Sequence, residues 1–231
     1  MGRRPQPDRE TRIAVTGTPA RRRLAPPASL ARDEWPDRLR LPLRFDPARL
    51  AGELAALEAR AWIDHFVSDH YQGRWCAIPL RIPAGTERQH PILQISSHPG
   101  TTAYVDAPLL DRLPAFQEVL RGLGFPLAAA RLMRLDPGAV VKPHSDPDLD
   151  GQGHARIHIP VRTNPGVRFV LNGTPVVMRA GECWYLRLSD THSLHNDGSE
   201  ARVHLVVDAP VGPELRALMV RAQSLPEHQR S

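Results

Sequence analysis

Two histidines and one aspartate in the second half of the chain have the residue types of a metal-ligand set. His144 and Asp146 stand two residues apart, and His192 follows further along the chain. Two imidazoles and one carboxylate hold non-haem Fe(II) on one face and leave the other face open. Arg202 stands ten residues after His192, and a guanidinium there could bind a dicarboxylate co-substrate as a bidentate pair. Together these residues predict an iron-dependent oxygenase.

The His-x-Asp spacing alone is weak evidence, because a second copy occurs at His195-Asn-Asp197. That copy runs into Gly198 and Ser199 and is interpreted as a turn with Asx hydrogen bonding. His144 instead follows an apolar segment. Alternate residues of a strand point to the same face, so His144 and Asp146 could bind one ion together.

His192 and His195 both lie at a suitable distance along the chain to complete the site. They are three residues apart, so on an extended segment they would point to opposite faces, and only one is expected to bind the metal. Spacing alone leaves open whether His195 takes the place of His192. The plain interpretation of the other histidine is a surface residue.

The segment 202–208 has two distinct faces. Val203, Leu205 and Val207 would pack in a core, while Arg202 and His204 share the other face. A buried guanidinium without an anion is costly, so an inward Arg202 would need a carboxylate, which 2-oxoglutarate could supply. The alternative is an exposed edge strand. Arg156-Ile-His158 repeats the pattern, and its polar face could line the same cavity or face water.

The surrounding elements predict a mainly β fold with flanking helices. Asp46 as N-cap and Pro47 in the first turn begin a helix that carries Leu50, Leu54, Leu57 and Ala61 at helical spacing. Further helices are predicted at 113–123, ending at Gly124, and at 214–222. Strands are predicted at 39–45, 75–82, 130–135, 140–142, 156–163, 167–171, 176–178, 182–188 and 202–208, with a loop at 83–105. Short strands at this spacing indicate a sandwich or barrel.

The net charge of +5 is concentrated at the N-terminus. Residues 1–33 hold eight arginines against three acidic residues, and the rest of the chain is balanced. A neutral body with a basic tail is not a basic binding face, so no nucleic acid is expected as a partner. We expect a disordered basic tail at 1–36 and a single domain at 37–231, with its core barrel at about 130–210.

Cys76 and Cys183 are the two cysteines of the chain. They argue against a disulfide scaffold or a thiolate zinc site and agree with a reducing cytoplasm, the location we expect. No apolar run long enough for a membrane span and no apolar leader is present. The sequence makes no prediction of the oligomeric state.

The segment from Arg131 to Asp208 resembles the aspartyl/asparaginyl β-hydroxylase family, including bacterial members that hydroxylate free proline. The resemblance covers about a third of the chain. The matching pieces agree in order and spacing: Arg134-Leu-Asp-Pro-Gly138, His144-Ser-Asp146, Arg156-Ile-His158-Ile-Pro160, Thr163-Asn164-Pro165, Gly181-Glu182-Cys-Trp184-Tyr185, His192 and Arg202-Val-His204-Leu-Val-Val-Asp208.

This resemblance implies a double-stranded β-helix, a jelly-roll barrel with flanking helices. It implies that Fe(II) is bound by His144, Asp146 and His192, and that Arg202, helped by His158, holds the distal carboxylate of 2-oxoglutarate. Arg156 would lie near the substrate or co-substrate, and O2 would be the oxidant. Mammalian-type peptide hydroxylases of the family lack the carboxylate that Asp146 supplies, so the sequence is more similar to the bacterial branches.

The predicted function is therefore an Fe(II)/2-oxoglutarate-dependent hydroxylase. It would insert oxygen into a C–H bond of an amino acid or peptide side chain and decarboxylate 2-oxoglutarate to succinate and CO2. The substrate is open between a free amino acid, a peptide or protein, and a lipid, with the lipid ranked last. One alternative is a non-catalytic cupin-like metal or ligand sensor, which would not need Arg202. Another is an interaction protein that uses the Arg-rich tail.

Overall fold

The computed structural model describes residues 1–2, 35–57, 62–65, 68–95 and 101–225. Residues 3–34 of the predicted tail, and Ala61 of the predicted first helix, lie outside these ranges. The α-helices are α1 (Pro47–Ala55), α2 (Pro114–Gly122) and α3 (Pro213–Gln223), and the short 3-10 helices are η3 (Ser68–His70), η4 (Pro91–Gln94) and η5 (Pro108–Arg112). The strands are β1 (Arg38–Arg44), β2 (Ile63–Asp64), β3 (Tyr71–Gln72), β4 (Trp75–Pro83), β5 (Tyr104–Asp106), β6 (Ala130–Leu135), β7 (Val140–His144), β8 (His154–Arg162), β9 (Val167–Leu171), β10 (Thr174–Val176), β11 (Glu182–Leu186), β12 (His192–Asn196) and β13 (Arg202–Pro210).

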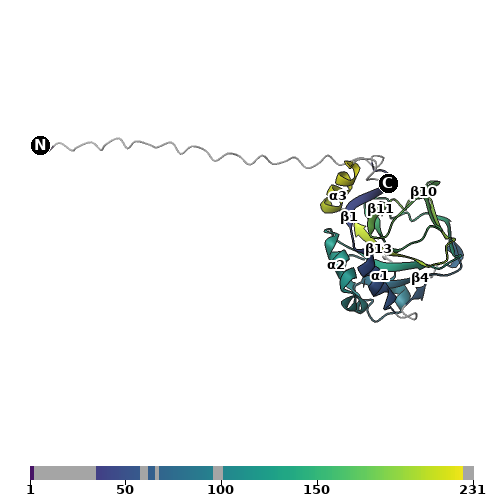
Figure 1. The fold of residues 1–231 in the computed structure, drawn as a ribbon. Coiled ribbons are helices and arrows are strands. Elements are labelled where there is room, and N and C mark those ends of the chain that lie inside the picture. The colour runs from purple at the N-terminus through teal and green to yellow at the C-terminus, as the bar shows by residue number, and fades with distance from the viewer. Residues whose placement is uncertain (3–34, 58–61, 66–67, 96–100, 226–231) are drawn as a thin grey trace.

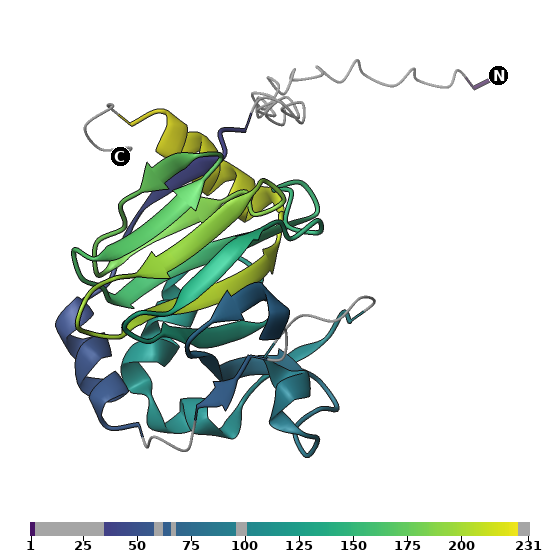
Figure 2. The ribbon, with the colours of Figure 1, turned by 90° about the vertical axis from the view of Figure 1, so that its right-hand side faces the viewer.

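Two antiparallel sheets form the body of the protein (Figures 1 and 2). The larger has the strand order β1-β11-β8-β13-β6-β4-β2, with β5 paired to β4, and the smaller has the order β10-β9-β12-β7-β3. They make a jelly-roll-like sandwich, which confirms the predicted mainly β, double-stranded β-helix class. The two sheets do not close into one barrel.

The helices pack on the outer face of the larger sheet (Figure 1). Asp46 caps α1, because its carboxylate accepts hydrogen bonds from the N–H groups of Ala48 and Arg49. The helix then buries Leu50 and Leu54. The odd-numbered residues of β8 and β13 lie in the same apolar core as the helices: Ala155, Ile157, Ile159, Val161, Val203, Leu205, Val207 and Ala209.

The even-numbered residues of β8 and β13 therefore face the opposite side, toward the smaller sheet. This second set is polar at the positions that matter for chemistry: Arg156, His158, Arg202, His204 and Asp208. A separate apolar core that draws on both sheets contains Leu135, Val141, Phe169, Leu171, Trp184, Leu186 and Leu194. The strand period thus sends one face of each long strand to the helices and the other to the space between the sheets.

Several predicted boundaries differ from the structure. Helix α1 ends at Ala55, although Leu57 still packs against the core. The expected loop 83–105 contains η4 and the start of β5. The predicted turn at His195-Asn-Asp197 is wrong for its first two residues, which end strand β12; Asn196 supplies the Asx interaction by accepting from the N–H of Gly198. Among the described residues, we find no helix with the length and apolarity needed for a membrane span.

Candidate metal centre

Three potential ligand side chains meet where β7 and β12 pair in the smaller sheet. His144 ends β7 and lies opposite His192, the first residue of β12. Asp146 follows β7, and its N–H donates to the carbonyl of Leu188 at 2.7 Å. One ligand atom each of His144, Asp146 and His192 lies within 4.8 Å of the other two. Nitrogen and oxygen donors at this separation can share one ion.

Both imidazoles are oriented by backbone carbonyl groups. Nδ1 of His144 lies 2.8 Å from the carbonyl oxygen of Lys142, and Nδ1 of His192 lies 3.0 Å from that of Asp190. A hydrogen bond at Nδ1 leaves Nε2 as the ligand atom and fixes the ring. Burial lowers the pKa of His192, which favours the neutral form that binds metals.

A cavity of about 730 Å³ opens onto this cluster. It lies between the sheets: His144 and His192 come from the smaller sheet, and His158 and Arg202 come from the larger one. Arg156 lines it too. All six side chains predicted from the sequence as site residues therefore face one space. His195 is not among the lining residues, since His192, Leu194 and Asn196 are the buried positions of β12.

Arg202 is the most unusual charged group of the cavity. It is 2% exposed, and one of its terminal nitrogens lies 2.7 Å from Nδ1 of His204. Nε has no hydrogen-bond partner, and no carboxylate of the described residues pairs with the guanidinium. Burial lowers the pKa of Arg202 to about 9. Both ring nitrogens of His158 are also buried without a partner, and burial together with Arg202 holds its pKa well below the usual range.

Sequence reasoning gave no role to two further charged residues of the cavity, Arg131 and Asp208. Asp208 accepts from both Arg131 and Arg156, and Arg156 also donates to Asp146. Burial alone would raise the pKa of Asp208, but the two arginines outweigh it and hold that pKa well below the usual range. The available signal was strand parity, because Asp208 stands on the same face of β13 as Arg202.

One wall of the cavity is apolar and aromatic. His65 stacks on Trp75 with ring centroids 3.8 Å apart, and burial lowers the pKa of His65 to about 4. Ile95, Met133 and Val206 continue this wall in one small core cluster. The cavity therefore has charged side chains at one end and an apolar wall beside them. This combination suits a small ligand with a charged end and a hydrocarbon body.

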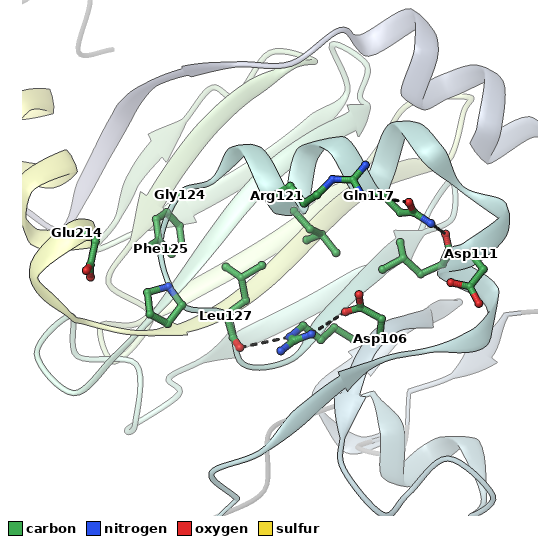
Figure 3. Close-up of a pocket in the computed structure, with 12 residues that line it drawn as sticks. Asp106, Asp111, Gln117, Arg121, Gly124, Phe125, Leu127 and Glu214 are labelled. Atoms are coloured by element: carbon green, nitrogen blue, oxygen red, sulfur yellow. Dashed lines mark hydrogen bonds and ion pairs between the residues drawn. The ribbon is translucent and has the colours of Figure 1, made fainter.

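A second hollow of about 550 Å³ lies elsewhere, between the end of β5 and the helices (Figure 3). Arg81 donates to the carbonyl of Leu127 and to Asp106, and Figure 3 labels both of these partners. Gln117 of α2 donates to the carbonyl of Leu110 on the same rim. Among the described residues, its lining shares no member with the cavity at the metal cluster.

A sequence model of the Aspartyl/Asparaginyl beta-hydroxylase family matches residues 51–210, more than half of the chain. The chain belongs to this family. It is 30% identical over 170 residues to the L-proline cis-4-hydroxylase of Rhizobium meliloti (strain 1021), a match that covers 72% of this chain and 58% of that protein. It is 28% identical over 171 residues to L-proline cis-3-hydroxylase 1 of Streptomyces sp., covering 72% of this chain and 57% of that protein.

Measured against these relatives, this member of the family spans less than two thirds of their length. Among solved structures it is similar to an oxidoreductase of the 2OG-Fe(II) oxygenase family from Burkholderia pseudomallei. The TM-score is 0.46 at 14% identity, over 70% of this chain and 77% of that one.

Proposed function

We propose that this protein is an Fe(II)/2-oxoglutarate-dependent hydroxylase of a small amino acid, with a peptide side chain as the second choice of substrate. The observation that carries the proposal is the presence, in one cavity, of the His144–Asp146–His192 cluster and the buried guanidinium of Arg202. The relatives named as proline hydroxylases support a free amino acid, and proline is the first to test.

The donor set fits Fe(II). Two neutral imidazoles and one carboxylate on one side of an ion leave its remaining positions open. The carbonyl groups of Lys142 and Asp190 hold the imidazoles in the orientation that binding requires. When bound, Fe(II) with 2-oxoglutarate and O2 supplies the oxidation that places oxygen in a C–H bond and yields succinate and CO2.

The larger sheet fits the co-substrate. Arg202 Nε and both ring nitrogens of His158 are buried polar atoms without a partner, and such atoms are costly unless a ligand satisfies them. The distal carboxylate of 2-oxoglutarate would accept from Arg202 in a charge-assisted pair. Nδ1 of His204 accepts from one terminal nitrogen of Arg202 and so limits the rotation of the guanidinium.

The other cavity residues would position the substrate and keep water out. The wall of Trp75, Met133 and Val206 removes apolar surface of a bound ligand from solvent. Arg156 lines this cavity and donates to Asp146, and this position supports a role for it near the substrate. We further propose one domain at 37–231 with a basic tail before it. A cytoplasmic location stays a prediction, supported by the buried free thiols of Cys76 and Cys183.

Turnover of the full chain tests the proposal. Purified protein is supplied with Fe(II), ascorbate, 2-oxoglutarate and a panel of free amino acids and short peptides, and succinate and hydroxylated product are measured by mass spectrometry. His144→Ala is the matched control. We expect substrate-dependent succinate from the wild type alone. Succinate no greater than that of the control over the whole panel would contradict the proposal. Binding of 2-oxoglutarate without any turnover would instead favour a sensor.

A further inference from the structure

A buried carboxylate, Asp208, ties together two guanidinium groups of the cavity. Oδ1 accepts from Nε of Arg156 at 2.7 Å, and Oδ2 accepts from Nη2 of Arg156 at 3.2 Å and from Nη1 of Arg131 at 2.9 Å. Asp208 is 3% exposed and lies directly opposite Arg156 where β13 pairs with β8. Two parallel hydrogen bonds of this kind fix the plane of the Arg156 guanidinium.

The remaining edge of that guanidinium reaches the metal cluster. Nη1 of Arg156 donates to Oδ2 of Asp146 at 2.6 Å. A bidentate arginine would occupy both oxygens of a carboxylate. Because Nε and Nη2 are committed to Asp208, Arg156 meets Asp146 through one nitrogen and one oxygen. The second oxygen of Asp146 is thereby left for an ion.

We propose that Asp208 is a positioning residue of the metal centre, acting through Arg156 on the orientation of Asp146. The inference rests on the function proposed above. Asp208 is outside the cluster of side chains that could hold an ion, within the described residues, so it would act on the ligand and not on the metal. Partners of this kind orient metal ligands, and their loss typically lowers metal affinity by about 10–100-fold.

Removal of the Asp208 charge has a defined structural consequence. In Asp208→Asn the amide keeps the shape but presents one oxygen and one NH2 group, so a donor faces a donor at Arg156 or Arg131. The Nε–Nη2 edge of Arg156 is then free to turn toward Asp146 and to occupy both of its oxygens. In this arrangement Arg156 competes with the metal for Asp146.

The test is a titration of the full-length protein with Co(II), followed by its visible ligand-field absorption, in the absence of 2-oxoglutarate. Asp208→Asn is expected to lower Co(II) affinity by about 10–100-fold, and Asp208→Glu, which restores the charge, to recover most of it. Glu182→Gln is the matched control. Glu182 is also fully buried and paired to arginine in the larger sheet, but it lines neither cavity. The Glu182→Gln variant should bind Co(II) with the affinity of the wild type.

A double-mutant cycle with Arg156→Met separates positioning from a general effect on the fold. In that background Asp208→Asn should change Co(II) affinity by no more than about twofold, the range within which independent sites add. Circular dichroism at the assay temperature shows which variants are folded, and if Asp208→Asn does not fold, Asp208→Ser takes its place in every comparison.

Unchanged Co(II) affinity in folded Asp208→Asn would overturn the inference. So would an equal loss with and without Arg156, or a failure of folded Asp208→Glu to bind more tightly than Asp208→Asn. Failure of the proposed function is distinguishable: a protein without turnover would leave these Co(II) affinities unchanged, whereas a chain without the metal site would bind no Co(II) even as the wild type. That result would remove the metal centre and the inference with it.

Discussion

Replacement of Arg202 by methionine is expected to stabilise the ligand-free protein. Burial lowers the pKa of Arg202 from its ordinary value to about 9, and at about 1.4 kcal/mol for each pKa unit this lowering corresponds to roughly 5 kcal/mol of unfavourable free energy at neutral pH. Methionine removes the charge and keeps much of the volume. It leaves Nδ1 of His204 without its donor, which costs about 1–3 kcal/mol. The net gain is therefore about 2–4 kcal/mol, or a rise in Tm of roughly 5–10 °C for a chain of this size.

The stability gained by Arg202→Met should decrease as the pH rises. Below about pH 9 Arg202 is charged in both the folded and the unfolded chain, so the full penalty is present. Above pH 9 the folded protein releases the proton of Arg202 while the unfolded chain retains it to a much higher pH, so the free-energy cost of the buried charge falls. The difference in Tm between Arg202→Met and the wild type should therefore shrink between pH 8 and pH 10.5. Arg81→Met, in the second hollow, is the control, since Arg81 is paired with Asp106.

The same variant should lose its response to the co-substrate. With Mn(II) in place of iron, 2-oxoglutarate at about 100 times its Kd should stabilise the wild type by about 2.7 kcal/mol and leave Arg202→Met unchanged. Thermal unfolding followed by circular dichroism measures both effects. A ligand-free variant less stable than the wild type at pH 7, or one that 2-oxoglutarate stabilises as much as the wild type, would refute this reasoning.

Two further predictions concern β12 and a tight turn. His192→Ala should abolish Co(II) binding, whereas His195→Ala, on the other face of β12, should retain it; equal losses in the titration would contradict the choice of ligand. Gly166→Ala should lower Tm, because its added Cβ would lie 2.3 Å from the backbone nitrogen of Gly198. Gly153→Ala, whose Cβ would meet no atom within 4 Å, is the control for calorimetry. Equal Tm values for the two alanine variants would show that the turn relaxes freely.

The elements with strong local signals could be predicted from the sequence. Asp46 marks the start of α1 through its side-chain cap, and Pro47 through its fixed backbone angle in the first turn. The alternation in β13 separates its two faces over the whole strand. Such patterns are local, and they need no knowledge of the neighbouring strands.

The elements that depend on pairing could not be predicted. Strand β12 reads His-Ser-Leu-His-Asn, without β-branched residues, and it is a strand because β7 and β9 pair with it on both sides. Strands β2, β3 and β5 have only two or three residues each. The contacts of Asp208 were hidden for the same reason, because Arg131 and Arg156 reach it from strands far away in the sequence.

In the proposed complex, His144, Asp146 and His192 hold one ferrous ion while Arg202 binds the far end of 2-oxoglutarate. Anomalous diffraction at the iron edge, from crystals grown without oxygen in the presence of Fe(II) and 2-oxoglutarate, tests it most directly. We predict one iron peak within bonding distance of all three side chains, with a carboxylate of 2-oxoglutarate against the guanidinium. An iron peak elsewhere would contradict the account. So would the absence of an iron peak in crystals in which 2-oxoglutarate is fully bound.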